Sequence, residues 1–130
     1  MHIAHRVFSE ACCRAFAPLA SDFGFLPPAV EPIGPECYVR FHKGTATVSV
    51  VWEPGVEPIV EFFYPALPGE TSTPWASRDG VAYARRFPSV PPPVPRYDSD
   101  SPEAAFAYLE RIMALLRSSE LQFLSAAHAA

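Results

Sequence analysis

The chain has 130 residues, of which 16 are proline and 6 are glycine, and its formal net charge at pH 7 is −4. Proline fixes φ and removes a backbone donor, so this density excludes a helical bundle, a coiled coil and a repeat array. Hydrophobic residues make up 49% of the chain, which is too many for a disordered protein and enough for a packed core. A single domain over residues 1–130 is expected at this length.

The charge and the cysteines limit the partners and the compartment. Fourteen acidic residues outnumber ten basic ones, and no basic cluster is denser than Arg85-Arg86, so we expect no nucleic-acid partner. No run approaches ~18 apolar residues and the N-terminus lacks the pattern of a signal peptide, so we expect neither a membrane span nor export. The odd number of cysteines, three, indicates reduced thiols and a cytoplasmic protein. Nine Arg against one Lys indicate a GC-rich bacterial gene.

The first third of the chain predicts a helix and then a connector. Apolar residues recur at steps of three and four and predict a helix over residues 3–23. Pro18 lies inside this helix and predicts a kink or a break there. Gly24 suits a left-handed cap at its end. Four prolines then predict an extended connector without regular structure over residues 27–35.

Residues 36–64 predict a three-stranded antiparallel meander. Apolar and polar residues alternate over 37–42 and again over 46–52, with a turn at Lys43-Gly44 between them. Glu53-Pro54-Gly55-Val56 has the sequence of a type II turn and leads into a third strand that ends at Tyr64. A sheet of three strands needs a helix over its buried face, so we expect the terminal helices to cover it.

Residues 65–100 predict loops and proline-rich structure. Thr73-Pro74 favours one short helix, whereas Asp79-Gly80 leaves open a hairpin of two short strands, 75–78 and 81–87. Residues 88–95 predict polyproline II, either as a surface segment or as a stiff spacer. Ser101 as cap and Pro102 at the first position predict a long helix over residues 102–124, packed on the sheet. The expected fold class is therefore α+β.

The cysteines and histidines of the first third do not form a metal-site pattern. Zinc ligands come in pairs two to four residues apart, and here only His2 and His5 have that spacing, so we expect no metal and no cofactor. Cys12 and Cys37 fit small buried hydrophobes, and Cys13 points off the apolar stripe. A small cysteine-dependent enzyme that pairs Cys13 or Cys37 with His42 stays open as an alternative.

Acids and aromatic residues near the third strand are the candidates for binding a protein partner, namely Glu57, Glu61, Tyr64 and Trp75. Glu61 shares a strand face with Ile59 and Phe63. If that face is buried, Glu61 needs an arginine or a backbone donor; if it is exposed, it forms an apolar patch that contains an acid. Trp52 continues the apolar face of the second strand, which indicates a core position.

The layout resembles that of a group of small uncharacterised bacterial α+β proteins, some of which are similar to immunity proteins that neutralise polymorphic toxins. The resemblance depends on Phe16-Ala17-Pro18-Leu19, on Phe23-Gly24-Phe25, on the strand 47–52 and on the helix from Pro102, while the stretch 88–95 departs from it. It implies a protein-binding role without catalysis. A type III secretion-type chaperone, also small, acidic and α+β, is a second alternative. The oligomeric state stays open and includes a homodimer.

Overall fold

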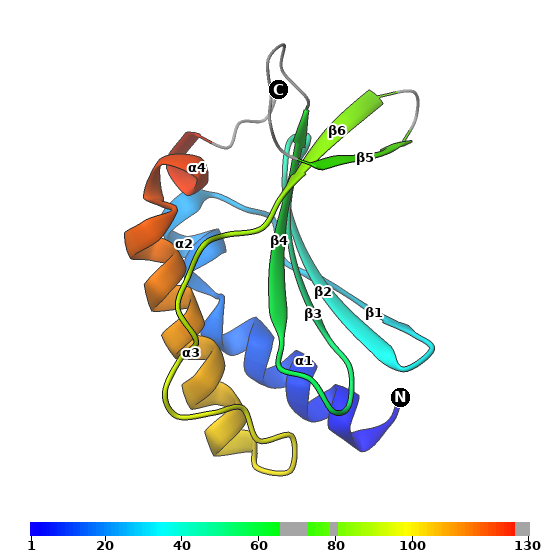
Figure 1. Ribbon diagram of the computed structural model, residues 1–130, viewed down its shortest axis with the longest axis vertical. Coiled ribbons are helices and arrows are strands. Elements are labelled where there is room, and N and C mark those ends of the chain that lie inside the picture. The colour runs from blue at the N-terminus through cyan, green and yellow to red at the C-terminus, as the bar shows by residue number, and fades with distance from the viewer. Residues whose placement is uncertain (66–72, 79–80, 127–130) are drawn as a thin grey trace.

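The computed structural model describes residues 1–65, 73–78 and 81–126, and the side chains of 73–78, 81–83 and 126 are left aside. It shows an α+β protein in which helices pack on one face of an antiparallel sheet (Figure 1). The helices are α1 Ile3–Ala15, α2 Pro18–Phe23, α3 Pro102–Ser119 and α4 Leu121–Ala126. The strands are β1 Ala29–Ile33, β2 Glu36–Lys43, β3 Ala46–Trp52, β4 Ile59–Pro65, β5 Thr73–Arg78 and β6 Val81–Arg86. The sheet has six strands in the order β1-β2-β3-β4-β6-β5, and not the three predicted.

The predicted break near the start of the chain is confirmed. A proline at position 18 clashes with the carbonyl of Arg14, so one helix over residues 3–23 cannot form. Instead α1 ends at Ala15, and α2 begins with Pro18 at its first position, where a missing N–H costs nothing. Gly24 ends α2 in the left-handed region with φ 77°, as predicted.

The prediction of no regular structure over residues 27–35 is wrong, because β1 lies there. Its residues pair with β2, with Val30 opposite Val39 and Pro32 opposite Cys37. An edge strand pairs along one side only, and this is the place in a sheet where proline is tolerated.

The favoured helix between residues 74 and 87 is also wrong, and the alternative hairpin of β5 and β6 is confirmed. Trp75 pairs with Tyr83 and Arg78 with Val81, while the predicted turn Asp79-Gly80 lies outside the described residues. The second half of β4 pairs with β6 and supplies a tertiary contact that outweighs the local helix signal.

The predicted C-terminal helix over residues 102–124 is two helices. The Ser101 side chain accepts a hydrogen bond from the Ala104 N–H and caps α3, as predicted. The helix stops at Glu120, whose carboxylate pairs with Arg86 of β6 at 2.8 Å. The chain then turns into α4, where the Phe123 ring stacks on the Phe62 ring of β4.

The two faces of the sheet differ in what covers them. The inner face packs against the helices and forms the core with buried side chains from β2, β3, β4, all four helices and the α1–α2 junction, the largest fully buried ones being Phe8, Phe16, Phe41, Phe62, Leu19, Leu109, Leu116 and Leu124. Trp52 is buried among them, as predicted. The described helices all lie on this side of the central strands (Figure 1), so the outer face is left to its own side chains.

Residues 87–97, which we call the proline strap, run from the end of β6 along α3 (Figure 1). Val90 and Tyr97 pack against the core and Pro93 is buried. The segment is therefore fixed on the surface of the protein and is no spacer.

Candidate functional site

Three hollows in the described part of the surface share Glu57. The first, which we call the slot, has a volume of about 270 Å³ and lies between the start of β4, the proline strap and α3. The second, of about 250 Å³, lies beside Ile59 and Trp52 on the outer side of the sheet. The third, of about 240 Å³, lies between the β3–β4 turn and Tyr97. We call these hollows together the Glu57 surface.

The β3–β4 turn positions Glu57. The Val56 N–H donates to the Glu53 carbonyl at 3.3 Å, and Gly55 between them has φ 92°. This is the type II turn predicted from the sequence, in which the third position needs glycine. Pro58 follows Glu57 and favours extended backbone at that residue. Glu57 thus lies just before the start of β4, between the turn and α3.

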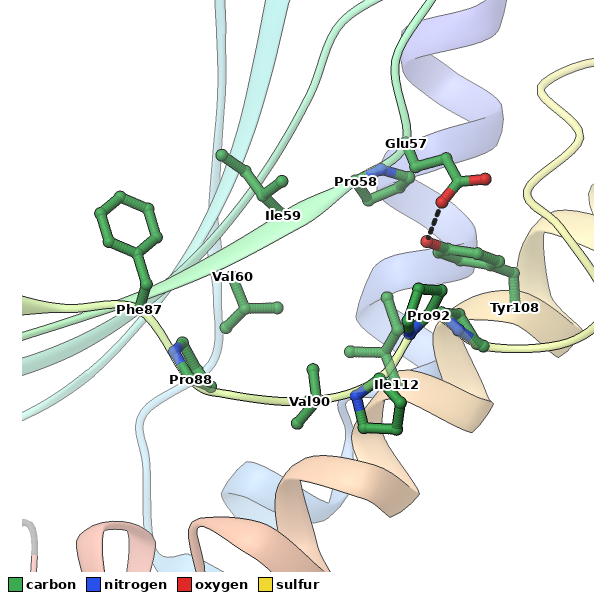
Figure 2. A pocket seen from close by; sticks show the side chains of 12 residues that line it. Glu57, Pro58, Ile59, Val60, Phe87, Pro88, Val90, Pro92, Tyr108 and Ile112 are labelled. Atoms are coloured by element: carbon green, nitrogen blue, oxygen red, sulfur yellow. Dashed lines mark hydrogen bonds between the residues drawn. The ribbon is translucent and has the colours of Figure 1, made fainter.

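Two groups contact the Glu57 carboxylate. The Tyr108 hydroxyl of α3 donates to Oε2 at 3.1 Å (Figure 2). Burial and the hydrogen bond to Glu57 raise the pKa of Tyr108, so its hydroxyl stays a donor throughout the physiological range. Arg96 of the strap lies 3.7 Å from Oε1, but its side chain is 90% exposed, so this pair is weak. The carboxylate is oriented by Tyr108 and only loosely paired with Arg96.

Exposed apolar side chains line the three hollows that share this carboxylate. Val56 is 53% exposed, Ile59 49% and Phe87 50%. Ile59 and Phe87 line the slot, and Val56 lines the other two hollows. Large apolar side chains grouped around an acid are typical of a surface that binds another protein.

Glu61 occupies a different environment from Glu57. It is only 8% exposed, and Arg85 of β6 lies 3.3 Å from its Oε2. Burial raises the pKa of Glu61, and the charge of Arg85 opposes that shift. The sequence predicted that a buried Glu61 needs an arginine or a backbone donor, and Arg85 is such an arginine. Phe63 on the same face is buried and Ile59 is exposed, so the predicted apolar face is divided.

Polar contacts neutralise the other charges on the outer face near β1. Arg40 pairs with Glu31 at 3.0 Å and lies over the ring of Tyr38 at 4.5 Å. The Tyr38 hydroxyl donates to Glu36 at 2.7 Å, and this bond raises the pKa of Tyr38 to about 12. These groups are paired within the sheet itself.

Glu57 and Tyr64, two of the predicted partner residues, lie far apart. Tyr64 lies seven residues beyond Glu57 in an extended segment, about 20 Å away along the strand. Its ring lies against the ring of Phe123 in α4, with 5.6 Å between the two ring centroids. Trp75 lies in β5 opposite Tyr83. The three hollows thus include Glu57, and neither Glu61 nor Tyr64 is among the residues that line them.

Of the two proposed cysteine–histidine pairs, Cys37 and His42 lie on opposite faces of β2. Cys37 faces the core, whereas His42, five residues along β2, lies on the opposite face, where its Nδ1 is 2.9 Å from the Thr47 hydroxyl. Burial raises the pKa of the Cys12, Cys13 and Cys37 thiols. No group of three metal-ligating side chains occurs within the described residues.

Comparisons of the chain with protein-family models, curated proteins and solved structures gave no match. Among the described helices none is both long enough and apolar enough to cross a membrane. The class of the molecule is therefore given by its fold, a layer of helices on one face of an antiparallel sheet, and its candidate site is the Glu57 surface.

Proposed function

We propose that this protein is a non-catalytic binding module that binds a protein partner through the Glu57 surface. The observation that supports the proposal most is the position of Glu57, a loosely paired carboxylate where three hollows meet among exposed apolar side chains. An immunity-like role, in which the module neutralises or escorts a bacterial protein, is the form that we favour.

The charge of the surface selects a basic partner. Apolar contacts from Val56 and Ile59 would exclude water around the Glu57 carboxylate when it faces an arginine or lysine of the partner, and this strengthens that ion pair. The net charge of −4 adds long-range attraction that accelerates association and weakens with salt. A basic toxin domain has the required chemistry.

Co-expression with the product of the adjacent gene tests the proposal. We expect the two proteins to co-purify and this protein to restore growth when the neighbouring product is toxic. Ile59→Asp should abolish both effects, because it places a second acid among the apolar contacts. Leu121→Asp on α4 is the matched control, since Leu121 is 50% exposed and Ile59 49%. Absence of co-purification and of rescue by the wild type, or equal loss in both variants, contradicts the proposal.

The chaperone alternative differs in oligomeric state. Type III secretion-type chaperones are usually dimers, so light scattering after size exclusion separates the two hypotheses. A monomer that binds its partner one to one supports the immunity-like role, and an obligate dimer favours the chaperone.

A further inference from the structure

The slot is an apolar recess with one polar end. Val60 points from β4 toward the strap, where Val90 lies, and Ile112 of α3 lies at the same level (Figure 2). Ile59 and Phe87 stand at its rim and are half exposed. The Tyr108 hydroxyl donates a hydrogen bond to the Glu57 carboxylate, and this pair closes the end of the slot opposite Phe87 (Figure 2).

The composition of the strap explains why the slot is not filled by a strand. Register places Phe62–Pro65 of β4 against β6, whereas residues 59–61 have a strand neighbour only on the β3 side among the described residues. The segment that faces them carries prolines at 88, 91, 92 and 93, which have no N–H to donate. No backbone hydrogen bond joins the strap to β4 in the described chain. The strap therefore runs beside the strand without pairing with it.

The size of the slot indicates what it can hold. Its volume of about 270 Å³ lies below the range of about 300–1,000 Å³ that is usual for sites of drug-sized ligands and cofactors. One large apolar side chain fits this space. Such a side chain, inserted into a recess of the partner at the centre of a contact surface, is the usual anchor of a protein interface.

The charge at the end of the slot indicates what stands next to that side chain. Glu57 uses Oε2 to accept from Tyr108, and Oε1 faces only the exposed Arg96 at 3.7 Å among the ion pairs of the described residues. A cation from a partner can replace Arg96 at little cost, because the existing pair is exposed and long.

We propose that the slot receives one large apolar side chain of the partner protein, and that an arginine or lysine adjacent to it in the partner's sequence pairs with Glu57 in place of Arg96. The proposal rests on the proposed function, since it specifies the chemistry of the partner that the Glu57 surface binds.

Methyl NMR with two dipeptide probes tests the proposal independently of any natural partner. The full-length protein, labelled at Ile, Leu and Val methyls, is titrated with acetyl-phenylalanyl-arginine amide and with acetyl-phenylalanyl-glutamate amide. The arginine probe should shift the methyls of Val60, Val90 and Ile112 saturably, with a dissociation constant of about 1–10 mM, as one pocket and one exposed ion pair allow. The glutamate probe should bind at least about fivefold more weakly, because its charge is repelled.

Two variants assign the effects to the slot. Glu57→Gln should remove the preference for the arginine probe and leave the weaker apolar binding in place. Val90→Phe should fill the slot and abolish the shifts with both probes, while unchanged signals of the buried Leu19 and Leu124 methyls show that the fold is retained.

The results that overturn the proposal are also distinct. It is wrong if the slot methyls show no saturable shifts at the solubility limit of the arginine probe, or if both probes bind equally well. A partner that co-purifies and depends on Ile59 while the probes leave Val60 and Val90 unmoved would support the proposed function and overturn this inference. Probe binding with the predicted preference, together with failure of co-purification, would support this inference and overturn the proposed function.

Discussion

The two halves of β4 differ in sequence and in surroundings. Phe62 and Phe63 pair with β3 on one side and with β6 on the other, and the ring centroids of Phe62 and Phe123 lie 4.2 Å apart. Residues 59–61 pair with β3 and, among the described strands, with no strand on their other side, where the proline strap lies across the slot. The second half is therefore held by strands on both of its edges, whereas in the first half Ile59 is left exposed next to Glu57.

Truncation of one apolar side chain in each half should separate the two roles most strongly. Phe62 is fully buried and Ile59 is half exposed. Phe62→Ala should lower the free energy of unfolding by about 3–5 kcal/mol, because it leaves a cavity beside Phe123. Ile59→Ala should cost less than about 1 kcal/mol. Urea denaturation monitored by circular dichroism measures both values, and equal losses would contradict the distinction.

The hydroxyls of two neighbouring tyrosines should differ in their effect on stability. Tyr108→Phe removes the donor to Glu57 and should cost about 1 kcal/mol. Tyr97 is the matched control, because its buried hydroxyl has no hydrogen-bond partner among the described residues. Tyr97→Phe should therefore be neutral or stabilising. Thermal unfolding of the two variants checks this, and a larger loss for Tyr97→Phe would show that the slot end is not held as described.

Glu61 is the last residue of the first half of β4. Its titration should make the free energy of unfolding fall as the pH rises above 4.5. Burial raises its pKa above the ordinary 4.5, although Arg85 opposes the shift. The folded protein therefore holds this proton more tightly than the unfolded chain does, and the resulting stabilisation is complete below pH 4.5 and lost as the pH rises through the native pKa. Glu61→Gln removes this titration.

The free energy of unfolding of Glu61→Gln minus that of the wild type should thus rise between pH 4.5 and neutral pH. Denaturation midpoints across this range measure the difference. Glu110→Gln, at an exposed position of α3, is the control for the loss of one acidic side chain. A difference that falls with pH would mean that the attraction of Arg85 outweighs burial.

The smallest expected effect is spectroscopic. Tyr38 should ionise near pH 12, and Glu36→Gln should lower its pKa, because it removes the charged acceptor of the tyrosine hydroxyl. Ultraviolet difference titration follows the phenolate directly. A pKa unchanged by the substitution would show that the pair does not form in solution.

Local sequence patterns predicted much of the fold. Pro18 and Gly24 marked the end of the first helical region, and Ser101-Pro102 marked the start of α3, because caps and breaks depend on adjacent residues. The strand β1 was missed because tolerance of Pro32 depends on its edge position. The hairpin of β5 and β6 was ranked below a short helix because the hairpin is stabilised by pairing with β4, and a local sequence pattern does not show that pairing.

The candidate site was predictable only in part for the same reason. Glu57 was singled out from the sequence, but its surroundings come from far along the chain, and Tyr108 is 51 residues away. Phe87 and Val90 reach the slot because the strap folds back along α3. A local signal did exist in Val56 and Ile59, two apolar residues that flank an acid and a proline at a turn.

The most direct test of the central claim compares two charge reversals in binding to the purified partner. Glu57→Lys and Glu110→Lys change the net charge equally, but only Glu57 lies on the Glu57 surface. By calorimetry, Glu57→Lys should weaken binding at least about tenfold, or about 1.4 kcal/mol, and Glu110→Lys less than about twofold. Equal weakening by both variants, or none by Glu57→Lys, would contradict the account.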